Sequence, residues 1–304
     1  MQALLIRRFV TKIKLSIVIL SYNTKDLLVA CLGSLEKVVK EVDFETIVVD
    51  NGSSDDSVEA IEKLKIKNFK LKIIRNRANL GFAAGNNIAK NFCRGEYVLF
   101  LNSDTLIKES TLRETIKYME QNLGVGAMTC KIILPSGKFD RDARRSFPTP
   151  WIAFTHFSGL DRIFPKSKLF ARYWYGYISP NSEHEVDVLE GAFFLTRRKV
   201  LDEVDWFDET YFLDGEDIDL SWRIKEAGYK IIYYPKVSII HIKKASKKKP
   251  VKENKKRFTM AGVNSMEIFY KKRLWQKYPI FINVLVLAAI KMLKIGRYFK
   301  LLLP

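Results

Sequence analysis

The stretch Tyr97-Val-Leu-Phe-Leu-Asn-Ser-Asp104 decides the fold class of this chain. It begins with a short apolar run of the length of a buried strand and ends in a carboxylate. In open α/β sheets, ligands bind just past the carboxyl ends of the strands. The stretch therefore predicts a buried strand that carries Asp104 to a ligand site.

Short apolar strands and amphipathic helices alternate on both sides of this stretch. We predict strands at 15–20, 45–50, 70–74, 97–101, 229–234 and 237–241, an ordered segment at 186–196, and helices that include 81–92, 109–121, 198–204 and 216–227. Such alternation predicts a mostly parallel, twisted sheet that is covered by helices on both faces.

The region from about Pro135 to Glu185 lacks this regularity and is rich in aromatic and basic residues. Long irregular segments are usually functional or disordered, and this one is too aromatic for disorder. Two interpretations stay open. The region is either a packed surface cover or a flap that binds the acceptor and faces a membrane.

The charge of the chain is concentrated at its C-terminal end. The 304 residues carry a net charge of +18, and 17 Lys or Arg stand against two acids from Lys243 to Pro304. The three cysteines are scattered without metal-ligand spacing, which is typical of reduced thiols in a cytosolic protein. The first residues, 1–8, have no apolar stretch long enough for a signal peptide, so nothing argues for export.

Polar groups follow several of the predicted strands. Asp50 is interpreted first as a turn and cap residue, and second as an acceptor for the N–H of a uracil or thymine ring. The segment 75–87 places polar side chains and glycines at a helix start, which suits a phosphate-containing ligand. The crowded acids of 214–219 raise one another's pKa and make a plausible general base. His241 is either a structural residue or a metal ligand.

Five segments carry a resemblance to family 2 glycosyltransferases: Ser16-Ile-Val-Ile-Leu-Ser-Tyr-Asn23, Val48-Val-Asp-Asn-Gly-Ser53, Asn79-Leu-Gly-Phe-Ala-Ala-Gly-Asn-Asn87, Asn102-Ser-Asp104 and Gly215-Glu-Asp-Ile-Asp-Leu220. Within that family the chain resembles bacterial rhamnosyltransferases of cell-surface polysaccharide synthesis. The segments 145–150 and 190–198 are further points of similarity.

The resemblance implies a GT-A (Rossmann-like) fold. It implies a glycosyltransferase domain at 15–242, with a nucleotide-binding half at about 15–134 and an acceptor half at about 135–242. The charge pattern, which the resemblance does not cover, predicts a basic, amphipathic C-terminal tail at 243–304. The resemblance also implies roles for single residues. Asp217 would be the catalytic base, with Glu216 beside it. Asp104 and His241 would ligate Mg²⁺ or Mn²⁺, and Asn102 replaces the first acid of the fuller Asp-x-Asp form. The nucleotide sugar would be held by Ser21, Asn23, Asp50, Asn79, Gly81, Asn86, Asn102 and Ser103.

The implied activity is inverting transfer of a sugar from a nucleotide sugar to a polyprenyl-diphosphate-linked or polysaccharide acceptor. Thymidine-diphosphate rhamnose is favoured as donor by resemblance only, and a uridine-diphosphate hexose stays open. The basic tail and the apolar run 278–290 predict a cytoplasmic enzyme held peripherally on the anionic inner face of the cell membrane. A run of 13 residues is shorter than the ~20 that a spanning helix needs.

Two other interpretations of the tail stay open. It could be a solvated segment without a function, or it could bind RNA or a membrane on a non-catalytic scaffold. No RNA-binding motif accompanies it, so we expect no nucleic acid partner.

Overall fold

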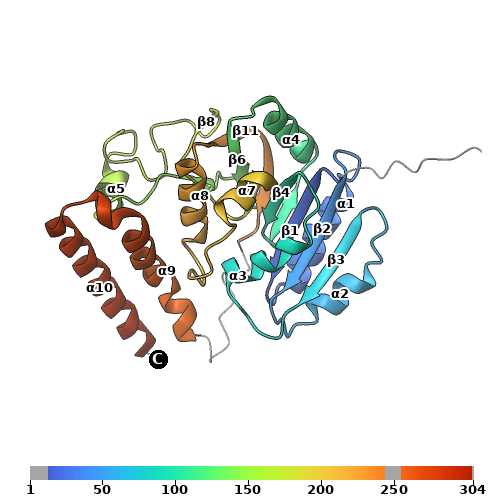
Figure 1. The fold of residues 1–304 in the computed structure, drawn as a ribbon, viewed down its shortest axis with the longest axis horizontal. Helices are drawn as coiled ribbons and strands as arrows, with labels where there is room; N and C mark the ends of the chain where they lie inside the picture. The colour runs from blue at the N-terminus through green and yellow to red at the C-terminus, as the bar shows by residue number, and fades with distance from the viewer. Residues whose placement is uncertain (1–12, 244–254, 303–304) are drawn as a thin grey trace, which may run out of the picture.

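The computed structural model describes residues 13–243 and 255–302, in which helices flank a central sheet and two further helices lie at the C-terminal end (Figure 1). The strands of the large sheet are β1 (Leu15–Ser21), β2 (Phe44–Asp50), β3 (Lys70–Arg75), β4 (Tyr97–Leu101), β5 (Thr105–Ile107), β6 (Val125–Ile133), β8 (His184–Glu185), β10 (Phe193–Arg197) and β11 (Lys230–His241). A small second sheet pairs β7 (Arg144–Arg145) with β9 (Val188–Leu189). The α-helices before the C-terminal segment are α1 (Lys25–Glu36), α2 (Ser57–Lys63), α3 (Phe82–Asn87), α4 (Thr111–Gln121), α5 (Pro150–Phe157), α6 (Leu160–Ile163), α7 (Arg198–Val204) and α8 (Glu216–Glu226).

The strand order of the large sheet is β3-β2-β1-β4-β10-β6-β11-β5. The first four strands are parallel, β10 runs antiparallel to β4 and β6, and β11 is parallel to β6. Every residue of β2 and β4 is buried, as expected for parallel strands that are covered on both faces. The prediction of a mainly parallel α/β sheet flanked by helices is confirmed.

The pairing of β5 with β11 brings two distant parts of the chain together. β5 begins directly after Asp104 and runs antiparallel to the end of β11, with His241 opposite Thr105. The backbone N–H of Ile242 donates to the carbonyl of Asp104 at 2.9 Å. Asp104 and His241 are therefore neighbours at the carboxyl-end edge of the sheet.

The irregular region contains the short helices α5 and α6 and is packed through the buried Arg144. Its guanidinium donates to the carbonyls of Ser179 and Ile178 at 3.2 and 2.6 Å. Phe154 and Phe157 of α5 remain more than half exposed. The region is thus an ordered cover with aromatic side chains at its surface.

The segment predicted as a basic tail forms two packed helices where the structure describes it. These are α9 (Lys255–Phe269) and α10 (Ile280–Leu302), joined by the π-helix η5 (Tyr270–Leu274) and the 3₁₀-helix η6 (Trp275–Lys277). Phe269 stacks edge-on against Trp222 of α8 with ring centroids 5.7 Å apart. The predictions for residues 1–8, 244–254 and 303–304 lie outside the described residues. Within the described ranges, none of the helices is both long and apolar enough to cross a bilayer.

Candidate active site

A cleft of about 720 Å³ opens where the strands β1, β2, β4 and β11 end. The loops that follow these strands line it, together with Glu190, the loop that precedes α8, and Phe258 and Thr259 of α9. Nine of the predicted site residues line this cleft: Asn23, Asn79, Gly81, Asn102, Ser103, Asp104, Glu216, Asp217 and His241. Three others, which the structure also describes, are not part of the lining: Ser21, Asp50 and Asn86.

Asp104 and His241 form the buried pair at one end of the cleft. The His241 Nε2 lies 3.2 Å from the Asp104 Oδ1, and both side chains are 5% exposed or less. A carboxylate and an imidazole at this distance are a donor set that suits Mn²⁺ or Mg²⁺ when phosphate oxygens and water complete the shell. The geometry fits the ligand roles that the sequence suggests.

The other nitrogen of His241 faces a second acidic cluster that the sequence analysis missed. The His241 Nδ1 lies 3.5 Å from the Asp140 Oδ2 and 3.7 Å from the Glu190 Oε1. Ligand atoms of Asp140, Glu190 and His241 all lie within 4.8 Å of one another, so this triad is an alternative cation site. However, the ammonium of Lys243 lies 2.9 Å from Asp140 and 3.6 Å from Glu190, and so it already supplies a positive charge there.

The charges around His241 shift its pKa. Burial alone would lower this pKa, but the hydrogen bonds of Asp104 and Asp140 and the charge of Glu190 outweigh burial and raise it to about 9. Burial also raises the pKa of Glu190 to about 7, although His241 and Lys243 oppose the shift. A divalent cation that binds the Nε2 must displace a proton, so its binding weakens as the pH falls below about 9.

We expect Asp104→Asn to abolish Mn²⁺ binding and Asp140→Asn to weaken it by about 10–100-fold. Asp104 would be a direct ligand and Asp140 would only orient the imidazole, and loss of such outer partners typically costs that much. Titration of the protein with Mn²⁺, followed by electron paramagnetic resonance at two pH values, measures both effects. Asp142→Asn is the matched control, because Asp142 contacts Lys243 at 2.7 Å and is itself 43% exposed. Retention of Mn²⁺ by Asp104→Asn, with loss in Asp140→Asn, would place the ion in the triad instead.

A second part of the cleft is built from the loops after β1 and β2, and Thr24 of the first loop bonds Ser103, the neighbour of Asp104, at 3.0 Å. The buried Asp50 accepts a hydrogen bond from the N–H of Ser53 through its Oδ2, which confirms the turn interpretation. Its Oδ1 is buried and has no hydrogen-bond partner among the described residues, so it is a spare acceptor beside Asn51 of the cleft lining. A ligand N–H could use this oxygen. Ser21 bonds Thr24 of the lining at 2.8 Å.

An asparagine network shapes another part of the cleft wall. The Asn51 Nδ2 donates to the Asn79 Oδ1 at 3.0 Å, and the same oxygen accepts from the N–H of Gly81 at 2.9 Å. Gly81 has a φ of +93°, and a Cβ there would lie 2.4 Å from the carbonyl of Phe212. Only glycine fits this close approach. Asn86 bonds the carbonyl of Phe82, and so it supports the wall from behind.

The acids at the start of α8 form the third part of the site. The Asp217 Oδ2 accepts a hydrogen bond from the Arg145 Nη2 at 2.5 Å, and both side chains are 13% exposed or less. Glu216 is buried, and its Oε2 has no hydrogen-bond partner among the described residues. Burial, reinforced by the charges of Asp217 and Asp214, raises the pKa of Glu216 well above its ordinary value. The two neighbouring acids thus differ: Asp217 has a guanidinium partner, and burial beside other acids raises the pKa of Glu216.

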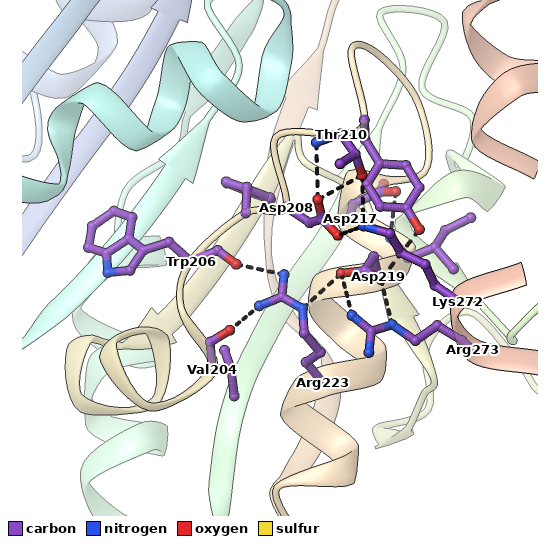
Figure 2. Close-up of polar contacts among 12 residues, drawn as sticks. Val204, Trp206, Asp208, Thr210, Asp217, Asp219, Arg223, Lys272 and Arg273 are labelled. Carbon is purple, nitrogen blue, oxygen red and sulfur yellow. Dashed lines mark hydrogen bonds and ion pairs between the residues drawn. The ribbon is translucent and has the colours of Figure 1, made fainter. Parts of the chain in front are cut away.

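Helix α8 is anchored from both sides through Asp219, which is fully buried. Figure 2 shows Asp219 between two guanidinium groups, with the Nε of Arg223 at 2.8 Å and the Nε of Arg273, from η5, at 2.7 Å. Arg223 also donates to the carbonyls of Val204 and Trp206. The C-terminal segment is therefore tied to the helix that carries Glu216 and Asp217.

Four residues of the site were not among the sequence predictions for it: Arg145, Asp140, Glu190 and Lys243. Arg145 and Glu190 begin the segments 145–150 and 190–198, which resemble family 2 glycosyltransferases. That resemblance is the signal that could have identified the two residues. Asp140 follows a turn with no pattern of its own, and Lys243 was counted only as part of the basic tail.

Solved structures of similar shape define the class of fold. The chain resembles TarS of Staphylococcus aureus (residues 1–349), solved in complex with UDP, with a TM-score of 0.53 and 18% identity; the match covers 83% of this chain and 65% of that one. It also resembles the mannosyltransferase PcManGT from Pyrobaculum calidifontis, solved with GDP-Man and Mn²⁺, with a TM-score of 0.57 and 18% identity over 85% of this chain and 64% of that one. The fold is the GT-A fold of nucleotide-sugar transferases.

Sequence comparisons then give the family. The model of glycosyl transferase family 2 matches residues 16–205. The rhamnosyltransferase WbbL of Escherichia coli (strain K12) is 29% identical over 170 residues, which are 53% of this chain and 60% of WbbL. A poly(ribitol-phosphate) beta-glucosyltransferase of Bacillus spizizenii is 35% identical over 111 residues, which are 36% of this chain and 18% of that protein. The matches thus span 60% or less of these two relatives. The chain belongs to glycosyltransferase family 2.

Proposed function

We propose that this protein is an inverting glycosyltransferase that moves L-rhamnose from thymidine-diphosphate rhamnose to a lipid-linked or polysaccharide acceptor. One observation carries the proposal: the Asp104–His241 pair and the Arg145-bound Asp217 line the same cleft. The rhamnosyl donor is favoured by the similarity to WbbL. A uridine-diphosphate hexose remains the second candidate, because TarS was solved with UDP.

The proposed reaction is a single displacement at the anomeric carbon. The acceptor oxygen bonds to that carbon while its proton passes to the Asp217 carboxylate, and the bond from the carbon to the diphosphate oxygen breaks. Burial and its acidic neighbours raise the pKa of Glu216 well above its ordinary value, which makes Glu216 the weaker candidate for the base and favours Asp217. Mg²⁺ or Mn²⁺ at Asp104 and His241 would offset the negative charge of the leaving nucleoside diphosphate.

The donor end of the cleft has the groups that a nucleotide requires. Asp50 would accept from the imide N–H of the base through its free Oδ1, with Ser21 beside it. Asn23, Asn79, Gly81, Asn86, Asn102 and Ser103 would shape the pocket for the ribose, the diphosphate and the sugar. An imide N–H is present in both thymine and uracil, so this contact does not distinguish the two donors.

We place the enzyme in the cytoplasm, peripherally on the anionic inner face of the cell membrane. The support is the cluster of 17 basic residues from Lys243 to Pro304 against two acids. A polyprenyl-diphosphate-linked acceptor would lie at such a surface. We also propose that the chain divides into a transferase domain at 15–242 and a basic segment at 243–304.

Hydrolysis and binding across a panel of nucleotide sugars, with Mg²⁺, Mn²⁺ or EDTA, tests the proposal. We expect slow hydrolysis of thymidine-diphosphate rhamnose that EDTA suppresses, because the metal offsets leaving-group charge. Preferential use of a uridine-diphosphate sugar would overturn the rhamnosyl assignment and keep the transferase. Failure to bind every donor would refute both.

A further inference from the structure

We infer that the outer face of α10 is a docking surface for an anionic lipid bilayer. This inference rests on the proposed function only for the location of the acceptor. The helix carries a stripe of apolar residues with alternating spacings of four and three positions: Phe281, Leu285, Ala288, Met292, Ile295 and Phe299. Residues at these spacings lie on one side of a helix. The stripe spans about 27 Å at 1.5 Å per residue.

The stripe faces away from the rest of the protein. Four residues of the stripe are between 61% and 67% exposed: Phe281, Leu285, Met292 and Phe299. The other two, Ala288 and Ile295, are exposed as well. Ile280, Val284 and Tyr298 beside it are also exposed, so the apolar face is broader than a narrow helix-pairing seam. Scattered exposed apolar residues are ordinary, but a continuous face of this length marks an interaction surface.

The opposite side of α10 is fixed to α9 and cannot turn the stripe inward. The buried Asn283 accepts from the Tyr270 hydroxyl at 2.6 Å, and the buried Ile290 belongs to the apolar cluster shared with α9. Lys294 pairs with Glu267 of α9 at 2.5 Å, and Arg297 donates to the carbonyl of Thr259. Figure 1 shows α10 as the outermost element, with α9 between it and α8.

The charge of α10 decides which partner fits the stripe. From Ile280 to Leu302 the helix contains Lys291, Lys294, Arg297 and Lys300 and not one acid. Lys294 and Arg297 are engaged with α9, whereas Lys291 is exposed next to Met292 of the stripe. A second copy of α10 offers no acid to pair with Lys291. An anionic bilayer surface satisfies both halves of the pattern, because the apolar stripe enters the acyl boundary and Lys291 reaches the headgroups.

The same packing sets where the cleft lies relative to the bilayer. Thr259 lines the cleft, and its carbonyl accepts the hydrogen bond from Arg297 of α10. The body of α10 and then α9, whose Thr259 forms part of the cleft wall, therefore separate the docking face from the cleft. A lipid-linked acceptor that stays in the bilayer would lie on the α9 side of the cleft.

Co-sedimentation of the full chain with vesicles tests the docking surface. We expect binding to vesicles that contain phosphatidylglycerol, weaker binding to pure phosphatidylcholine, and at least tenfold weaker partitioning of Met292→Glu. Leu123→Glu is the matched control, because Leu123 is an apolar residue that is 73% exposed and precedes β6, outside the C-terminal helices. Equal partitioning of the two variants would overturn the inference. So would a dimer in sedimentation velocity that Met292→Glu dissociates without any vesicle binding, because the stripe would then face a second copy.

Donor hydrolysis in solution separates this inference from the proposed function. Met292 lies outside the cleft, so Met292→Glu is expected to hydrolyse donor at the unaltered rate while losing vesicle binding. Vesicle binding by a protein that binds no nucleotide sugar would refute the proposed function and leave the docking surface intact.

Discussion

Asp217→Asn is expected to lower kcat by about 10²–10⁴-fold while the Kd for the nucleotide sugar stays within about twofold. That loss is typical when a positioned general base is removed. Asn is nearly isosteric with Asp and can still accept the hydrogen bond from Arg145, so the cleft should keep its shape. Transfer to acceptor measures kcat, and calorimetric titration with donor measures Kd.

Glu216→Gln is the matched control for this experiment. Burial and the neighbouring acids raise the pKa of Glu216, and Gln imitates the protonated carboxyl group that this shift favours. We therefore expect this variant to keep kcat within about tenfold of the unaltered enzyme. A large loss in Glu216→Gln together with a small one in Asp217→Asn would assign the base to Glu216. Loss of donor binding in Asp217→Asn would instead show that the carboxylate maintains the site.

The strands that the sequence predicted best are those that hold the donor half of the cleft. β1, β2 and β4 are short, rich in branched or aromatic residues and buried on both faces, so each is a compact apolar run. β6 escaped prediction because Gly126 and Thr129 interrupt its apolar run. In the structure Gly126 is required by packing, since a Cβ there would lie 2.6 Å from Tyr229. β5 has only three residues.

The break predicted between 229–234 and 237–241 is a register shift within one strand. Pro235 lacks an N–H and cannot donate to the sheet, but β11 continues past it, with the pairing to β6 shifted between Tyr234 and Ser238. This continuation delivers His241 to Asp104. The proximity of the two residues agrees with the ligand roles implied by family resemblance, and those roles stay a prediction.

The acidic cluster behind His241 could not be derived from local pattern. The cluster combines three segments that are far apart in the chain and carry Asp140, Glu190 and Lys243. These residues follow β6, β9 and β11, and the folded sheets bring them together. Each residue alone is an ordinary charged residue near a turn. The same limit applies to α10. The predicted apolar run ended at Ile290, whereas the exposed stripe continues past Lys291 to Phe299, because the helical repeat places Lys291 beside the stripe and not within it.

Asp219→Asn is expected to reduce the free energy of unfolding by about 3–5 kcal/mol. The substitution removes the negative charge between Arg223 and Arg273, whose side chains are only 14% and 21% exposed, and breaking a buried pair by removing one partner typically costs this much. Denaturation in urea, followed by fluorescence, measures the change. Limited proteolysis within α9 and α10 should accelerate as well, because Arg273 ties the C-terminal helices to α8 (Figure 2).

Asp208→Asn provides the comparison that isolates burial. Asp208 pairs with Lys272, the residue next to Arg273, at 2.5 Å, but that lysine is 38% exposed (Figure 2). Exposed pairs of this kind contribute about 1 kcal/mol or less. Similar losses in the two variants would contradict the anchoring role of Asp219. If Asp219 is the anchor, Asp219→Asn should also weaken donor binding without touching the donor, because Phe258 and Thr259 of α9 form part of the cleft wall and depend on the same attachment.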